Sequence, residues 1–529
     1  MLKSLFLAVT IVANSPGYYT SLANHIKRWL AGERVQAAVT SPEAIPTILR
    51  NEKTVFLVGL DSPSSAQMQA LRDFVDRGGK IVSFHSSSKA LADLMGVKCT
   101  GFRSAAYPGC WSRMDFQTFR PAGFPISIRQ SSGVLNAAVP ASGRGGRVLA
   151  YWSDRNGKPT GDAAWIETRA GWWMTHVLTA DGDERLKAQL VAAMVGASEP
   201  GKWSAAESVA RREKERKALV SYAAAQVPQK GEIRAVWDHS GCGLYPGDWP
   251  RTMRLLRNAH VTDLFVNVAG AGFAHYASNV LPRSKTFSDE GDQLSACLKA
   301  AAGTGVRVHA WILCFTATRS SSGTVADFGR RGWLLKTPAG KTTEYLDPSR
   351  KDVRDRVLSA IDEIQASYAV DGIHLDFVRW YEGAAKPANA AAVVSGFVLD
   401  ARRHVKRPRW LTAAVLGKYP ACVASVGQDW CSWLDTNAVD YVVPMDYTSD
   451  NARFDGYLAQ HAEKKSRARR TIAGIGVTAN ESRLDARQVI DQIKLARGRG
   501  LAGIALFDLD TVLEKDILPY LAMGLWRSK

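Results

Sequence analysis

The segment VDGIHLDFVRW at 370–380 decides the fold of the second half of this chain. Apolar residues flank a glycine and two aspartates, which is typical of a short strand that is buried on both faces and ends in a polar turn. Side chains alternate along a strand, so Ile373 and Leu375 are predicted to pack against helices. His374 and Asp376 then face the opposite side, with Asp376 at the carboxyl end of the strand.

Seven further strand patterns surround this segment, and helical patterns separate most of them. The eight predicted strands lie at 232–238, 263–269, 306–313, 371–377, 410–417, 440–446, 471–476 and 503–508. The clearest helical patterns are RTMRLLRNA, DQLSACLKAAAG, RKDVRDRVLSAIDEIQASY and ARQVIDQIKLARGRG. Eight strand–helix units in about 290 residues predict an α/β fold of the (β/α)8 TIM barrel type over 231–529. A doubly wound sheet is the alternative, but no GxxxxGKS or GxGxxG phosphate loop follows a strand.

The N-terminal part of the chain predicts a separate α/β domain at 1–197. Strands such as TVFLVGL and KIVSFH alternate with capped helices such as SSAQMQALRDFVDRGG, which is typical of a parallel, flavodoxin-like sheet covered on both faces. The pattern becomes rich in strands after Gly96, and the helix DERLKAQLVAAMVG closes the domain. Residues 198–230 then predict a charged linker helix with its charges in solvent.

The first residues allow two interpretations. Lys3 and the apolar run at 4–13 are typical of a short signal peptide, whereas AVTIVANS at 8–15 is typical of a first strand. We favour the strand, because the predicted sheet needs one there. The signal peptide would imply a periplasmic or extracellular location.

The chain is basic, with a formal net charge of +18 over 529 residues, which favours anionic partners. Nucleic acid is not expected, because there is no zinc-finger spacing, RNP-type motif or basic heptad segment, and an anionic glycan is the better expectation. No apolar run reaches the roughly 20 residues of a membrane span. Among seven cysteines, a disulfide is conceivable for Cys99 with Cys110 or Cys422 with Cys431, and burial as free thiols is the alternative.

Acidic residues occur where predicted barrel strands end, which is where TIM barrels carry their active sites. Asp371 and Asp376 lie roughly 16 Å apart along one strand and cannot share a substrate bond. Asp376 and Asp446 end the fourth and sixth strands, and alternate strands contribute to the same layer of the lumen. In glycoside hydrolysis one carboxyl group protonates the leaving oxygen, while the other attacks the anomeric carbon or activates water. We therefore expect Asp376 and Asp446 to be the catalytic pair.

A second set of residues near the strand ends offers polar groups and flat faces to a sugar. The substrate-binding candidates are Trp237, Asp238, Asn267, His309, Trp311, His374, Arg379, Trp380, Tyr447 and Asp508. The aromatic members also form low-dielectric walls, which raise the pKa of a carboxylic acid. For the tryptophans, plain packing without sugar contact is an equal alternative.

The barrel motifs resemble the family-10-like glycosyl hydrolases, a group of glycosidase barrels. The matching segments are VRVHAWI at 306–312, YLDPSRKDVRDRVLSAIDEI at 345–364, VDGIHLDFVRW at 370–380 and VDYVVPMDY at 439–447. The resemblance implies a hydrolase that acts on a polysaccharide or glycan without a metal or organic cofactor. A second acidic residue often follows the first in the family's strand-4 motif, but Phe377 stands there, so only Asp376 is carried over. The assignment of Asp446 is based on the predicted barrel geometry, with support from the strand-4 and strand-6 aspartate pair of α-galactosidase-like barrels.

The segment LRDFVDRGGKIVSFHSSSKALADLMGV at 71–97 resembles the class I glutamine-amidotransferase-like fold, in the non-catalytic form attached to glycoside hydrolases. Catalytic members place a cysteine on the sharp turn after a strand, whereas the turn at 84–88 reads FHSSS. Ser86 lacks the glycines of a GxSxG elbow, so this domain is expected to be non-catalytic. Such domains often lie at subunit contacts, which allows a homo-oligomer.

Two alternatives to a glycosidase stay open. One is a glycan-binding module that keeps the barrel and has lost turnover, and this alternative gains weight if Asp446 points away from Asp376. The other is a different barrel enzyme, in which Lys418 forms a Schiff base as in aldolases. The following Tyr419 and Pro420 favour a plain loop lysine.

Overall fold

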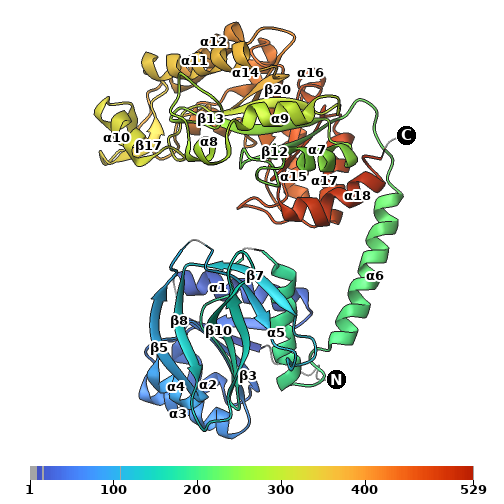
Figure 1. Ribbon diagram of the computed structural model, residues 1–529. Coiled ribbons are helices and arrows are strands. Elements are labelled where there is room, and N and C mark those ends of the chain that lie inside the picture. Colours follow the sequence, from blue (N-terminus) through green and yellow to red (C-terminus); the bar gives the residue numbers. More distant parts are fainter. Residues whose placement is uncertain (1–8, 15–16, 108, 181, 528–529) are drawn as a thin grey trace. The chain divides into compact units, whose positions relative to one another are not determined.

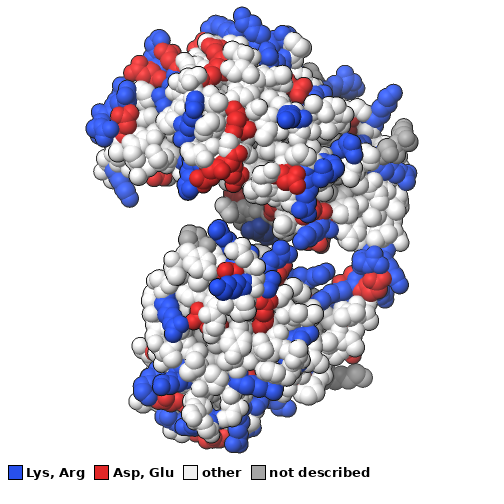
Figure 2. All heavy atoms as spheres, viewed as in Figure 1, with Lys and Arg blue, Asp and Glu red and all other residues white. Residues whose placement is uncertain are grey.

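The computed structural model describes residues 9–14, 17–107, 109–180 and 182–527 (Figure 1). The chain forms two compact units, 1–215 and 216–529, and the division falls within helix α6 (Ala205–Ala224). None of the helices in the described ranges combines the length and the hydropathy that a membrane span requires. On the face drawn in Figure 2, Lys and Arg side chains are interspersed with Asp and Glu over both units.

The first unit contains a nine-stranded sheet with the order β2-β1-β3-β4-β11-β10-β9-β6-β7. Its strands are β1 (Val9–Ala13), β2 (Ala37–Thr40), β3 (Thr54–Val58), β4 (Lys80–Phe84), β6 (Trp111–Phe116), β7 (Ser127–Ser132), β9 (Arg147–Ser153), β10 (Pro159–Thr168) and β11 (Gly171–Met174). The neighbouring strands from β2 to β11 are parallel, and the pairs beyond β11 are antiparallel. The predicted strand near the N-terminus is therefore present at Val9–Ala13, and residues 1–8 lie outside the described part.

Helices cover both faces of this sheet, because its central strands are apolar on both sides. One core packs strand residues against α1 (Tyr18–Gly32) and α5 (Glu184–Ser198). The other core packs strand residues against α2 (Ile45–Ile48), α3 (Ser65–Asp76) and α4 (Lys89–Met95). The antiparallel pair of β5 (Val97–Ser104) with β8 (Val134–Pro140) forms a separate two-stranded sheet.

The turn after β4 is occupied by structural hydrogen bonds. His85 has a φ of 51°, a left-handed conformation that is uncommon for a non-glycine residue. The Ser86 hydroxyl donates to the Leu60 carbonyl at 2.5 Å and accepts from the Ser88 N–H at 3.1 Å. Both roles hold the turn together, and they leave the Ser86 hydroxyl buried rather than presented to a substrate.

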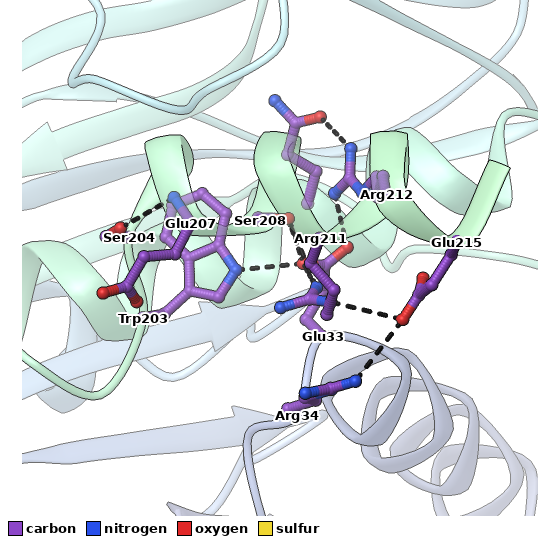
Figure 3. Close-up of polar contacts among 10 residues, drawn as sticks. Glu33, Arg34, Trp203, Ser204, Glu207, Ser208, Arg211, Arg212 and Glu215 are labelled. Atoms are coloured by element: carbon purple, nitrogen blue, oxygen red, sulfur yellow. Dashed lines mark hydrogen bonds and ion pairs between the residues drawn. The ribbon is translucent and has the colours of Figure 1, made fainter. Parts of the chain in front are cut away.

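A buried glutamate ties the first half of α6 to the first unit, as Figure 3 shows. The Glu33 carboxylate accepts hydrogen bonds from Trp203 Nε1 at 3.0 Å, Ser208 Oγ at 2.7 Å and Arg211 Nη2 at 2.9 Å, and it also pairs with Arg212. Burial alone would raise the pKa of Glu33, but these donors outweigh burial and lower it. The prediction of a fully solvated charged face on this helix is therefore wrong at Arg211 and Arg212, because both arginines neutralise Glu33.

The second half of α6 belongs to the barrel unit. Ala223 is fully buried in the barrel's core, and the Tyr222 hydroxyl donates to Asp491. The guanidinium of Arg487 lies 4.2 Å from the centre of the Tyr222 ring. Aromatic and polar contacts thus fix this end of the helix on α17 (Ala486–Gly498).

The second unit is a closed barrel of eight parallel strands. They are β12 (Ile233–Asp238), β13 (Asp263–Gly270), β15 (Arg307–Leu313), β18 (Gly372–Asp376), β19 (Trp410–Leu416), β20 (Tyr441–Met445), β21 (Ile472–Gly476) and β22 (Gly503–Phe507). Pairing of β12 with both β13 and β22 closes the ring. All eight strands occur where the sequence predicts them, so the TIM barrel is confirmed and the doubly wound alternative is excluded.

An outer ring of helices and an inner row of side chains give the barrel two cores. The principal helices are α7 (Trp249–Asn258), α9 (Gln293–Ala301), α11 (Lys351–Ser367), α12 (Ala390–His404), α14 (Trp430–Asp435), α15 (Asn451–His461), α17 and α18 (Leu518–Met523). The lumen core is formed by Ile233, Ala235, Trp237, Phe265, Phe273, Trp311, Leu313, Val443, Ile472 and Ala505. The seven cysteines are free thiols, so neither conceivable disulfide is present.

Candidate active site

The bottom layer of the lumen is a structural ion-pair cluster. His309 Nε2 and Asp263 Oδ1 are 2.8 Å apart, and Arg307 contacts both oxygens of Asp263 at 2.8 Å. Burial alone would raise the pKa of Asp263, but hydrogen bonds from His309 and Arg307 lower it to about 2. His309 was expected to bind substrate, and this expectation is wrong, because it is fully buried two residues below the mouth-facing Trp311.

The next layer fixes His374 in one tautomer beneath the barrel mouth. Trp237 Nε1 donates to His374 Nε2 at 2.9 Å, so the ring proton must be on Nδ1, which contacts Thr412 Oγ1 at 2.8 Å. The His374 ring also stacks on Phe265, with a centroid distance of 4.1 Å. Burial holds the pKa of His374 well below its usual value. His374 is therefore a neutral support for Trp237 and not a surface for sugar.

Asp376 ends β18 and lies at the wall of a cavity in the barrel mouth. Its side chain is 5% exposed, and both oxygens accept hydrogen bonds, from Phe377 N–H at 2.6 Å and from Trp311 Nε1 at 3.2 Å. Burial raises the pKa of Asp376, while the charge of Arg379 and the two donors oppose that rise. A buried carboxyl group that opens onto a cavity is a candidate for acid–base or nucleophilic chemistry.

The cavity has a volume of about 530 Å³, enough for a small oligosaccharide unit. Its walls are rich in aromatic residues from different strands, and its lining is Trp237, His239, Ser240, Trp311, Leu313, Thr318, Arg319, Asp376, Phe377, Arg379, Ala414, Met445, Tyr447, Asn480 and Phe507. Four predicted binding residues are therefore brought together with Asp376: Trp237, Trp311, Arg379 and Tyr447.

Asp446 does not join Asp376 in this cavity. Its carboxylate is 1% exposed and contacts His461 Nε2 on α15 at 3.0 and 3.1 Å. Met445 and Tyr447 line the cavity, so Asp446 between them points to the helix layer. The expected convergence of Asp376 and Asp446 across the lumen is therefore wrong.

Asp508 is an acidic residue that follows β22 at the same barrel mouth; its neighbour Phe507 lines the cavity, whereas Asp508 itself is not among the lining residues. Its Oδ1 accepts the N–H groups of His239 at 3.1 Å and Leu509 at 2.7 Å. Burial, with a contribution from the charge of Asp238, raises the pKa of Asp508 to about 7. Burial holds the pKa of the Tyr447 phenol well above its usual value, and the charges of Asp376, Asp508, Glu481 and Asp446 add to that rise.

Three other predicted binding residues lie away from the cavity lining. Asp238 is fully buried and accepts N–H groups from Ser240, Gly241 and Gly243, so it organises the turn after β12. Trp380 donates to the Ala385 carbonyl at 3.1 Å and lines a smaller neighbouring cavity of about 140 Å³.

Asn267 is fully buried opposite Trp311 in the β13–β15 register, and both polar atoms of its amide lack a hydrogen-bond partner. Its expected contact with substrate therefore does not occur through the described cavity lining.

His239 and Arg319 are the two titratable cavity residues that were not among the binding candidates. His239 directly follows the predicted first strand, and its position at a strand end was the available signal. Burial lowers the pKa of His239, so its ring is largely neutral near pH 7. Arg319 comes from an irregular segment after β15, where no pattern in the sequence indicated a role. Among the described residues, no group of three His, Cys, Asp or Glu side chains is placed to hold a metal ion.

Residues 232–393 match the family described as Glycosyl hydrolase-like 10. The match contains YLDPS at 345–349 and DGIHLDFVR at 371–379, and it ends before the sixth strand. It confirms the predicted resemblance for this segment and supports glycan hydrolysis in general. No curated protein is significantly similar in sequence to the chain.

Solved structures share parts of the fold at low sequence identity. The PgaB (BpsB) glycoside hydrolase domain from Bordetella bronchiseptica is 13% identical, with 56% of this chain and 100% of that chain covered and a TM-score of 0.45. A class V chitinase from Pseudomonas fluorescens is 11% identical, with 55% and 99% covered and a TM-score of 0.36. A thua-like protein from Bacteroides uniformis is 12% identical, with 37% and 93% covered and a TM-score of 0.30. Because these TM-scores are below 0.5, they assign no substrate or activity to this chain.

Proposed function

We propose, from the match of residues 232–393 to a glycosyl hydrolase-like family, that this protein hydrolyses glycosidic bonds in a polysaccharide or glycan. One observation carries the proposal: Asp376 is a buried carboxyl group that opens onto a cavity of about 530 Å³ with aromatic walls. Trp237, Trp311 and Tyr447 offer the flat apolar faces that sugar rings contact. Together these features provide a reactive carboxylate and a sugar-binding surface at one place.

Asp508 replaces Asp446 as the proposed second carboxyl group. Its pKa of about 7 means that a substantial fraction carries a proton near neutral pH, as a general acid requires. Its Oδ1 accepts both of its hydrogen bonds from backbone N–H groups, which leaves Oδ2 to carry the proton.

Asp376 is better suited to the second role, because donors at both of its oxygens and the charge of Arg379 oppose the rise in its pKa that burial causes. In the proposed reaction the Asp508 proton passes to the glycosidic oxygen as the bond from that oxygen to the anomeric carbon breaks. Asp376 either attacks the anomeric carbon or takes a proton from the attacking water.

The test is digestion of a glycan panel with product analysis, using the wild type, Asp376→Asn and Asp508→Asn. Asp371→Asn is the matched control, because Asp371 lies at the opposite end of β18 and its Oδ2 accepts the Val308 N–H at 2.8 Å. We expect Asp376→Asn to abolish product formation with the fold intact and Asp371→Asn to keep it. Full activity of Asp376→Asn would refute its assigned role.

A glycan-binding barrel without turnover is the second candidate. The observation in its favour is the contact of Asp446 with His461, which leaves Asp376 as the acidic residue among the lining residues of the cavity. Isothermal titration with glycans that the wild type does not cleave distinguishes the two functions. Binding that depends on Trp311, together with absence of products from every bound glycan, would support this second candidate.

Several features stay predictions. We propose that the N-terminal unit is a non-catalytic amidotransferase-like domain, with the borders 1–197, 198–230 and 231–529. A periplasmic or extracellular location and a homo-oligomeric state likewise await measurement by cell fractionation and analytical ultracentrifugation.

A further inference from the structure

Two arginine side chains, Arg319 and Arg379, line the same cavity as Asp376. Within the described ranges, neither guanidinium forms an ion pair with a carboxylate, whereas Arg307, Arg402 and Arg497 of the same unit do. Asp376 is the only carboxylate among the described lining residues, so the lining carries more positive than negative charge. A cavity with excess positive charge attracts an anionic ligand.

The two arginines differ in what holds them. Arg319 Nη1 donates to the His239 carbonyl at 2.7 Å, so this side chain is engaged in fixing the turn after β12. Arg379 has no hydrogen-bond acceptor in the described structure, and its Nη1 atom is buried without a partner. Its guanidinium lies 4.5 Å from the centre of the Phe377 ring, and both residues line this cavity and the smaller one beside it.

An unpartnered buried donor on a cationic group is unfavourable, and a ligand oxygen would remove that cost. The planar guanidinium matches the two oxygens of a carboxylate or an ester sulfate. We propose that Arg379 binds the acidic group of an anionic sugar, a uronic acid or a sulfated sugar, in the subsite beside Asp376. This inference rests on the proposed function, because it treats the cavity as a glycan-binding site.

Arg379 has a simpler alternative role, which is to stabilise the negative charge of Asp376 without touching substrate. In that case loss of its charge would affect neutral and acidic glycans equally. A lysine, which keeps the charge but lacks the fork, would then restore the wild-type behaviour. Ligand pairs that differ only in their acidic groups separate the two roles.

The experiment is isothermal titration of full-length Asp376→Asn protein, which removes turnover. The probes are oligosaccharides of polygalacturonate, alginate, hyaluronate and chondroitin sulfate, each beside its carboxyl-reduced form, and chondroitin sulfate also beside its desulfated form. The same titrations are made with Arg379→Gln, Arg379→Lys and Arg251→Gln added to Asp376→Asn. Arg251 is the matched control, because its guanidinium also stacks on an aromatic ring, 3.7 Å from the centre of Tyr245, but outside the cavity lining.

We expect at least one acidic glycan to bind roughly 10- to 100-fold more tightly than its neutral counterpart, as for a charge-assisted hydrogen-bond pair. Arg379→Gln should remove this preference, Arg379→Lys should restore only part of it, and Arg251→Gln should keep it. The carboxyl-reduced and desulfated arms show which acidic group is bound.

The inference is overturned if no acidic glycan binds more tightly than its neutral form, or if Arg379→Gln and Arg251→Gln reduce affinity equally. It is also overturned if the Arg379→Lys protein shows the same preference for acidic glycans as the protein with arginine at this position. Preferential binding that depends on Arg379, in a wild type that releases no product, would support this inference and refute the hydrolase, so the two failures are distinguishable.

Discussion

Replacement of Asp508 by asparagine should stabilise the barrel at alkaline pH and leave it nearly unchanged at acidic pH. Burial raises the pKa of Asp508 from its ordinary 3.8 to about 7, so folding favours the protonated form. The folded state therefore loses stability as pH rises from about 4 to about 7, and the loss is complete above that range. This difference in pKa corresponds to a loss of at most about 4 kcal/mol in the free energy of unfolding. Partial exposure of the side chain reduces the loss to about 2–4 kcal/mol.

The structure allows asparagine to fit without new conflicts. The Oδ1 atom of Asp508 accepts both backbone N–H groups, and an asparagine oxygen keeps those bonds while its NH2 group takes the place of Oδ2. The assay is calorimetric unfolding of the full chain at pH 4.5, 6 and 8. A gain of 2–4 kcal/mol corresponds to a rise in Tm of several degrees for a domain of this size.

Asp510→Asn is the control, because Asp510 Oδ1 also accepts two backbone N–H groups, from Val512 at 2.9 Å and Leu513 at 2.8 Å. We expect its Tm to show no alkaline gain over the wild type. If Asp508→Asn is no more stable than the wild type at pH 8, or gains the same amount at pH 4.5, the burial of a carboxylate at this position is refuted. Loss of glycan turnover in the same variant would show that the unfavourable burial of the Asp508 carboxylate serves catalysis.

Three further substitutions test other contacts. Trp311→Phe keeps an aromatic wall but removes the N–H donor to Asp376, and kcat/KM should fall by about 10-fold for a bond worth about 1.5 kcal/mol; an unchanged value would make Trp311 plain packing. Asp446→Asn should lower the free energy of unfolding by about 1–3 kcal/mol, because the charged contact with His461 is lost. Activity per folded molecule should stay near wild type, and a folded but inactive variant would show that Asp446 is catalytic. Glu33→Ala should destabilise the N-terminal unit by about 2–4 kcal/mol in calorimetry, because Trp203, Ser208 and the half-buried arginines lose their shared acceptor; an unshifted transition would contradict this.

The sequence was sufficient for the barrel because its signals are local. Short β-branched runs alternate with amphipathic helical stretches, and this pattern predicts all eight strands with small errors at their ends. The inward position of His374 and Asp376 also follows from local geometry, since residues two apart on a strand share a face. The same rule fails for strand β20. Both sets of alternating side chains contain apolar residues there, so the sequence does not show which set faces the lumen.

The tertiary structure alone decided which polar residues meet. Asp446 ends a barrel strand as Asp376 does, but packing of α15 brings His461 to it and draws it into the helix layer. His309 and Trp311 share a strand face, but the stagger of the neighbouring strands decides that Asp263 meets the first and Asp376 the second.

The sequence by itself determined the spacing at which apolar side chains recur, and this spacing predicts the strands, the helices and the barrel. What only the tertiary structure decided is the height and rotation of each strand relative to its neighbours. Those depend on contacts between residues far apart in the chain, as between Trp237 and His374, and no local pattern records them. The candidate site is assembled from such contacts, which is why the place of Arg319 in the cavity lining emerges only in three dimensions.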